Sequence, residues 1–208
     1  MQRKRDTEDF ASCVLLLLTT SWRTSSGHPV RAAGSERCEE CSSLFRSLLL
    51  NISGLLNNDV LCYSISSSKA VMKSKAETVL ACAPTQKSGC MMQRNSSFSE
   101  SECMRNIMKD LAHYDAAIQS YLRSPLRSPE EEVALLNPTL GIIRNLRTKC
   151  SLMSDGDTDS TEDDVAQMWG DNTFNNRQEM CKMMRGFYAR AITINRAMGY
   201  ISSGDHRQ

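Results

Sequence analysis

Hydrophobic side chains recur at every third or fourth position in four stretches of this 208-residue chain. In the first stretch, for example, Leu44, Leu48, Ile52 and Leu55 fall on one face of a helix. Polar segments without this period separate the four stretches. The pattern predicts an all-α protein with helices at about residues 36–57, 99–123, 130–150 and 174–202.

Local signals mark where two of these helices begin. Ser99 and Glu102 have the spacing of a capping box, in which each side chain satisfies a backbone amide of the other residue. Ser128 followed by Pro129 is a second start signal, because proline is favoured in the first turn. Pro138 lies further along the third stretch, so that helix either kinks at Pro138 or begins there.

The lengths of the connections predict the topology. About six residues join the second and third helices, so these two should be antiparallel neighbours. Nearly forty residues precede the second helix and more than twenty precede the fourth, enough to run back along a helix of about 30–35 Å. We therefore expect a four-helix bundle of the up-up-down-down cytokine type, with long first and third crossovers. The first crossover has room for a short helix around residues 70–80.

The last predicted helix is apolar or small on two sides. One stripe, which includes Ala191, Ile194 and Met198, should face the core. The opposite side carries a single arginine among apolar and small residues: Ala189, Ile192, Arg196, Gly199 and Tyr200. Scattered apolar residues are normal on a surface. Arginine and tyrosine clustered among small residues are more typical of a protein–protein interface, which is the interpretation that we favour.

The amino terminus has the pattern of a secretory signal peptide. A basic start precedes the apolar run “FASCVLLLLTTSW”, and small and polar residues follow it. We expect residues 1–34 to comprise the signal and its flank, with cleavage between residues 26 and 34, and residues 35–208 to form the cytokine-like domain. A buried helix or a membrane anchor is the alternative. The run is short for a bilayer span, so we expect a secreted, extracellular chain without membrane insertion.

Nine cysteines are many for a chain of this length. Cys13 lies in the predicted signal, and the remaining eight form an even set that is typical of disulfides in a secreted protein. Two glycosylation sequons, at Asn51 and Asn95, indicate the same compartment. Cys38 and Cys41 form a CxxC motif, which is better interpreted as structural than as a redox or zinc site, because no strand or second ligand pair accompanies it.

The rest of the composition argues against other functions. A net charge of +1 gives no reason to expect nucleic-acid binding. The acidic segment that begins at Asp155 has neither the glycine nor the glutamate that a calcium-binding EF-hand loop requires. His113 is expected at the surface, and no nucleophile is paired with a base. We therefore expect no enzyme activity, no cofactor and no metal.

Several segments resemble the interleukin-12 alpha subunit family. “YARAITINRAMGYISS” resembles the last helix of that family, and “VLACAPTQKSGCMMQRNSSFSESECMRNIMKDLAHYDAAI” resembles its crossover and second helix. “NPTLGIIRNL” matches the third helix more loosely. The likeness covers about residues 36–202, and its degree indicates a non-mammalian member. The resemblance implies a long-chain four-helix cytokine of the interleukin-6 and interleukin-12 type.

The family resemblance also implies a partner. Its members form a heterodimer with a receptor-like beta chain, and an arginine of the last helix inserts into a pocket of that chain. By register within “TINR” this arginine corresponds to Arg196, surrounded by the outer-face residues named above. The resemblance further implies interleukin-12-type receptor chains, Janus-type kinases and STAT factors, and interferon-gamma responses of T cells and natural killer cells.

The resemblance implies three disulfides: Cys41–Cys90, Cys62–Cys181 and Cys82–Cys103. Cys38 and Cys150 are then left over, either for each other or for a bond to the beta chain, and Cys90 could match the interchain cysteine of the family instead. Two other functions stay open. One is a single-chain cytokine of the interleukin-6 type, and the other is a small thiol oxidoreductase that uses the CxxC motif.

Overall fold

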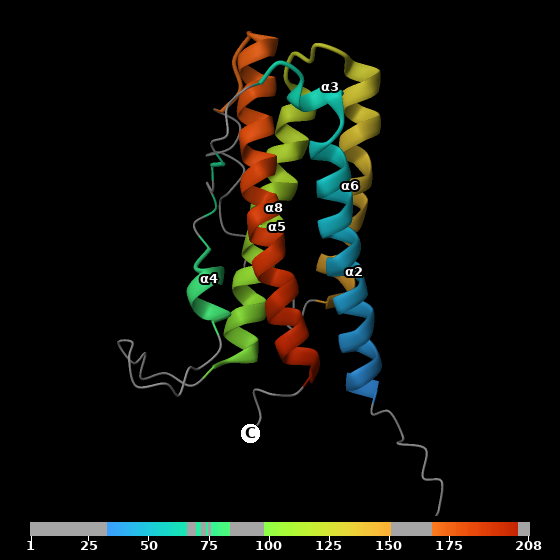
Figure 1. Cartoon of the computed structure of the whole chain (residues 1–208), viewed down its shortest axis with the longest axis vertical. Coiled ribbons are helices and arrows are strands. Elements are labelled where there is room, and N and C mark those ends of the chain that lie inside the picture. Colours follow the sequence, from blue (N-terminus) through green and yellow to red (C-terminus); the bar gives the residue numbers. More distant parts are fainter. Residues whose placement is uncertain are drawn as a thin grey trace, which may run out of the picture. The chain divides into compact units, whose positions relative to one another are not determined.

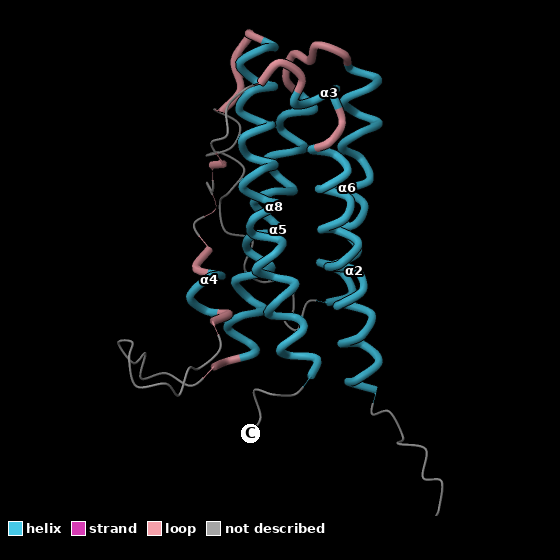
Figure 2. Tube along the Cα trace, in the orientation of Figure 1, coloured by secondary structure: helices cyan, strands magenta, loops and turns pink. Residues whose placement is uncertain are grey.

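The computed structural model describes residues 33–65, 70–71, 74, 76–83, 98–150 and 168–203. The predicted signal peptide, Cys90, Asn95 and the acidic segment lie outside these residues. By its backbone contacts the chain divides into residues 1–33 and 34–208, and all that follows concerns the second unit. Its described residues form helices and no strand (Figure 2), which confirms the all-α class. The helices are α2 (Ala33–Leu56), α3 (Asp59–Cys62), α4 (Thr78–Ala81), α5 (Glu100–Arg123), α6 (Pro129–Cys150) and α8 (Thr173–Ser203).

The four long helices lie where the hydrophobic period predicted them, and polar side chains cap their ends. The Ser99 side chain accepts a hydrogen bond from the backbone N–H of Glu102 at 3.3 Å and so caps α5. Helix α6 begins at Pro129 and continues through Pro138, so it does not begin at the second proline. Pro138 and Ala134, the residue whose carbonyl loses its helical donor, are both exposed, so water can satisfy that carbonyl.

Contacts between helices establish their relative directions. Asp110 of α5 pairs with Arg190 of α8, and Tyr114, one turn further along α5, stacks on Phe187, one turn earlier on α8, with ring centroids 3.8 Å apart. These two helices are therefore antiparallel. Helices α5 and α6, joined by a short turn, are antiparallel as well, as Figure 1 shows.

Helix α2 is fastened to α6 at two levels. Cys41, near the start of α2, is bonded to Cys150, the last residue of α6, and the Thr139 hydroxyl donates to Asn51 Oδ1 at 2.6 Å. Because the start of α2 meets the end of α6, these two helices run in opposite directions. Helices α2 and α5 therefore run one way, and α6 and α8 run the other way (Figure 1).

The core lies between the four long helices. Its largest fully buried side chains include two tyrosines and two phenylalanines: Tyr114, Tyr121, Phe45 and Phe187. Side chains of this size each contribute about 1.5–3 kcal/mol when they are buried. Helix α5 packs against α4 as well as α6 and α8, so it has neighbours on several sides. This explains why His113 is buried, with its ring against Tyr114, and the prediction of a surface histidine was wrong.

Two short helices lie in the first crossover. Helix α3 follows the end of α2 closely because Asn58 caps it by accepting from the Val60 N–H at 2.9 Å. Helix α4 occupies only the last part of the region where a short helix had room. A four-residue helix has little stability of its own, so contacts with α5 and α8 must hold α4 in place.

The structure contains the expected disulfides Cys62–Cys181 and Cys82–Cys103. The third expected bond, Cys41–Cys90, is wrong, since Cys41 is bonded to Cys150 instead, with Cα atoms 5.7 Å apart. The antiparallel packing of α2 on α6 brings these two residues together at one end of the bundle. Cys38 forms no disulfide with any described residue, and the suggested Cys38–Cys150 pair is excluded.

Candidate partner-binding face

Residues 189–200, near the end of α8, present two different faces. Ala191, Ile194 and Met198 are buried in the core. Five residues on the opposite side fall within about 100° of the helix circumference. We call them the outer face, and they are Ala189, Ile192, Arg196, Gly199 and Tyr200. Three of them, Ala189, Arg196 and Gly199, are exposed, and the other two are half-buried.

The first crossover covers the beginning of α8 and is held there by arginines. Arg177 is buried and donates to the Tyr63 carbonyl at 2.8 Å. Arg185, two turns further along, donates to the Ile65 carbonyl at 3.5 Å. The backbone N–H of Val71 then donates to a helix carbonyl of α8. These contacts end before the outer face begins, so the described residues between 63 and 71 of the crossover leave that face open.

A third arginine of α8 forms the most buried charge pair of the described bundle. Arg190 is 5% exposed and its Nε lies 3.2 Å from Oδ2 of Asp110, which is fully buried. The hydroxyl of Thr78, the first residue of α4, donates to the same carboxylate. We call these three residues the Asp110 clamp. It joins α4, α5 and α8 at one point.

Burial has the largest effect on the pKa values of Asp110 and its neighbour Tyr114. Desolvation raises the pKa of Asp110, although hydroxyls of Ser74 and Thr78 and the guanidinium of Arg190 act in the opposite direction. Desolvation also raises the pKa of the neighbouring Tyr114 hydroxyl, and the nearby Asp110 carboxylate adds to that shift. The cluster therefore lies in the apolar core, where burying its charged groups costs desolvation free energy, and not at the solvated surface.

Arg196 differs from the other three arginines of α8. It is exposed, and it makes no hydrogen bond or ion pair with any residue that the structure describes. Small residues lie on either side of it, at Ala189 and Gly199. A Cβ added to Gly199 would meet no atom within 4 Å, so no other described side chain covers the surface at this point beside Arg196. A partner's backbone can approach such a surface closely.

Aromatic packing fixes the far end of the outer face. The Tyr200 ring meets the Phe98 ring edge to face, with centroids 5.2 Å apart. Phe98 lies just before α5, so this contact joins the end of α8 to the start of α5. The Tyr200 ring is thereby held by the protein itself before any partner binds. Rigid aromatic side chains lose little entropy on binding and suit an interface.

Sequence reasoning missed two exposed apolar side chains on the crossover. Val79 is 51% exposed and Leu80 is 56% exposed, both on α4. The signal that could have found them is their position between Thr78 and Cys82, two residues that the fold holds inside. A helix of one turn that is fastened on one side must present its other side to solvent.

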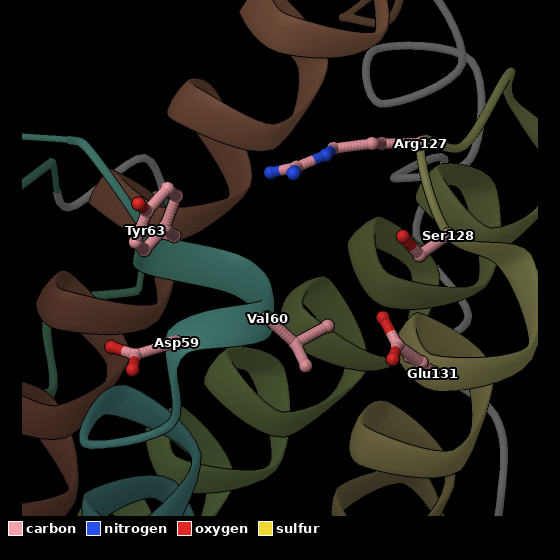
Figure 3. Close-up of a pocket in the computed structure, with 6 residues that line it drawn as sticks. All are labelled: Asp59, Val60, Tyr63, Arg127, Ser128 and Glu131. Carbon is pink, nitrogen blue, oxygen red and sulfur yellow. The ribbon is translucent and has the colours of Figure 1, made fainter.

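A shallow cavity of about 350 Å³ lies at the end of the bundle where α3 faces the turn between α5 and α6. Figure 3 shows Arg127 extending over it toward Tyr63, and the arginine carbon lies 6.0 Å from the tyrosine ring centre. Acidic side chains also line it, from Asp59 and Glu131. The mixture of charges and the open shape give no indication of catalysis.

Other predicted sites have the following positions. The Asn51 sequon lies on α2, half-buried beside Thr139. Cys41 is bonded to Cys150, so the CxxC cysteines cannot act as a dithiol pair and the thiol oxidoreductase hypothesis fails. Within the described ranges, no group of metal-binding side chains gathers and no helix is long and apolar enough to cross a membrane.

Comparison with known proteins gives one consistent family. A family model described as the interleukin-12 alpha subunit matches residues 11–204. The interleukin-12 subunit alpha of Capra hircus is 26% identical over 199 residues, which cover 84% of this chain and 87% of the relative. That of Marmota monax is 22% identical over 189 residues, covering 79% and 83%, and that of Macaca mulatta is 24% identical over 150 residues, covering 64% and 66%. No solved structure matches the chain.

Proposed function

The chain belongs to the interleukin-12 alpha subunit family, which is a family of cytokines and not of enzymes, and we propose that it is the alpha subunit of a secreted heterodimer. Its partner is a receptor-like beta chain, which binds the outer face of α8. The observation that carries this proposal is Arg196, an exposed arginine without a described partner in the middle of an apolar and small surface.

Arginine chemistry supports this assignment. A guanidinium offers five N–H donors in a plane and can hold a carboxylate through two parallel hydrogen bonds, while its stem packs on apolar surface. Arginine and tyrosine residues often carry most of the binding energy at the centre of an interface. Ile192 and Tyr200 supply the apolar surface beside Arg196, and Ala189 and Gly199 allow close approach.

The compartment follows from the same proposal. Residues 1–34 act as signal and flank and are removed between residues 26 and 34. The Asn51 and Asn95 sequons carry glycans, and the Asn51 contact with Thr139 uses Oδ1 and leaves the amide nitrogen for the sugar. Any covalent bond to the beta chain comes from Cys38 or Cys90, because the other six cysteines beyond the signal are paired within the chain.

The proposed heterodimer signals through cell-surface cytokine receptors. It binds receptor chains of the interleukin-12 type and promotes interferon-gamma responses of T cells and natural killer cells. Surfaces of the bundle away from the outer face of α8 remain accessible for these chains. Family membership supports this part of the proposal.

Co-expression with candidate beta chains tests the proposal. Wild type, Arg196→Ala and Arg196→Lys are secreted with a tagged beta chain and pulled down. We expect about a 30-fold loss of affinity for alanine, which corresponds to about 2 kcal/mol for a hot-spot arginine, and a smaller loss for lysine, which keeps the charge but not the fork. Arg144→Ala is the matched control, since Arg144 is an exposed arginine of α6.

Two outcomes contradict the proposal. If Arg196→Ala binds the beta chain as well as Arg144→Ala does, the outer face is not the interface. If no beta chain binds and the chain is secreted equally well alone, a single-chain cytokine of the interleukin-6 type replaces the heterodimer.

A further inference from the structure

The Asp110 clamp is unusual, because apolar residues of similar size in the same place would not cost the desolvation free energy of a buried charge pair. Asp110 and Thr78 are fully buried and Arg190 is 5% exposed, so three helices share one desolvated charge pair. A buried pair of this kind seldom adds stability relative to apolar packing, whereas it does specify one geometry. The geometry that it specifies here is the placement of α4.

Helix α4 is fastened at both of its ends. At the first residue, the Thr78 hydroxyl donates to Asp110. Immediately after the last residue, Cys82 is bonded to Cys103 in the first turn of α5. A single turn held at two points has a fixed rotation, so the side chains between those points have a fixed direction. Those side chains include Val79 and Leu80, the exposed apolar pair.

The position of α4 relative to the outer face follows from the clamp. Arg190 directly follows Ala189 in α8, so α4 meets α8 at the level where the outer face begins. Figure 1 shows α4 beside α5 and α8 in the half of the bundle that contains the end of α8. The Phe98–Tyr200 contact lies on the same, α5-facing side of the outer face. Helix α4, which carries the exposed Val79 and Leu80, therefore lies beside the outer face, at the edge nearest α5.

We propose that the Asp110 clamp is a positioning device, which holds α4 so that Val79 and Leu80 form a second part of the surface that binds the beta chain. This inference rests on the proposed function. The occupant is the same beta chain, because α4 packs on α8 at the level where the outer face begins, and its apolar pair would supply the area that a lone arginine needs around it to exclude water. Neither Asp110 nor Arg190 touches the partner.

The first experiment measures binding of the α4 pair. Val79→Ser/Leu80→Ser removes its apolar surface, and Leu50→Ser is the control, since Leu50 is 66% exposed on α2. We expect the double variant to lose about tenfold or more in affinity for the beta chain, mainly through faster dissociation, and the control to change less than twofold. If the double variant binds like the control while Arg196→Ala loses binding, the role of α4 is overturned and the proposed function stands.

The second experiment separates positioning from general stability. Asp110→Asn removes the charge pair, and Thr78→Val removes only the hydroxyl and keeps the shape, so one of them remains if the other fails to fold. Each should weaken binding in the wild-type background and cause little further loss in the Val79→Ser/Leu80→Ser background, because α4 no longer contributes there. Equal losses in both backgrounds mean that the clamp acts by stability alone and contradict the proposal.

Hydrogen exchange provides the independent readout. In Thr78→Val we expect faster exchange of the amides of Leu80 to Cys82, which bond within α4, with unchanged exchange in the middle of α6. Unchanged exchange in α4 overturns the positioning role, whatever the affinity is.

Discussion

Removing the Cys41–Cys150 bond should destabilise the folded chain substantially. The two cysteines are 109 residues apart in the sequence, and a lone crosslink of that span would contribute about 4.7 kcal/mol by restricting the unfolded chain. The Cys62–Cys181 bond shortens the covalent path that joins Cys41 to Cys150 in the unfolded chain. From Cys41 to Cys62 and from Cys181 back to Cys150, the loop that remains has about 50 residues, which corresponds to about 4 kcal/mol.

The assay is urea unfolding of the purified chain, followed by circular dichroism. The double variant Cys41→Ala/Cys150→Ala should lose about 4 kcal/mol of unfolding free energy. Alanine is used in place of serine because both cysteines are buried, and serine would leave a hydroxyl in the core. Cys90→Ala is the control, and we expect it to change the unfolding free energy by less than 0.5 kcal/mol, the size of an ordinary surface effect.

The opposite result would refute the pairing. If Cys90→Ala is as destabilising as the double variant, and non-reduced peptide mapping recovers Cys41 joined to Cys90, the bond runs to the crossover. In that case the contact between the start of α2 and the end of α6 does not determine the pairing.

Three further predictions follow from the buried polar contacts and the open surface. The pKa of Asp110 is raised above its ordinary value of 3.8, so the folded chain binds the proton of this carboxyl group more tightly than the unfolded chain does. The contribution of Asp110 to the unfolding free energy therefore increases as pH falls and is lost as pH rises through the raised pKa. The melting temperature of wild type relative to Asp110→Asn should therefore increase from pH 7 to pH 4, and a constant difference would contradict the shift. Tyr121→Phe removes the hydroxyl that donates to the buried Glu132 carboxylate and should cost about 1.5–3 kcal/mol in urea unfolding, so a loss below 0.5 kcal/mol would exclude a significant bond. Gly199→Trp should leave the melting temperature unchanged, because the site is open, and abolish binding of the beta chain, and retained binding would place Gly199 outside the interface.

The sequence was sufficient for features that depend on local periodicity. The period of three to four residues gave the long helices, and cap residues such as Ser99 marked where they begin. The same period separated the two faces of the last helix, since Ala191 and Met198 are buried and Arg196 is exposed. These features depend on residues that are close together in the chain.

The features that the sequence did not predict depend on packing between distant segments. The partner of Cys41 is decided by which helix ends meet, and spacing along the chain cannot specify that. Arg177 and Arg190 are arginines of an amphipathic helix, which composition alone would place at the surface, yet carbonyls of the crossover and a carboxylate of α5 draw them inward. The helical period singled out the face around Arg196, the resemblance to a family gave that arginine its role as the residue that inserts into the beta chain, and the structure adds that its surroundings are open.

Site-specific photo-crosslinking tests the central claim most directly. A photoreactive amino acid replaces Ile192 on the outer face of α8 or, as the control, Arg144 on α6, and each chain is co-expressed with the beta chain and irradiated. The account predicts a crosslink to the beta chain from position 192 and none from position 144. A crosslink from position 144 with none from position 192 would contradict it, because the beta chain would then cover a different face of the bundle.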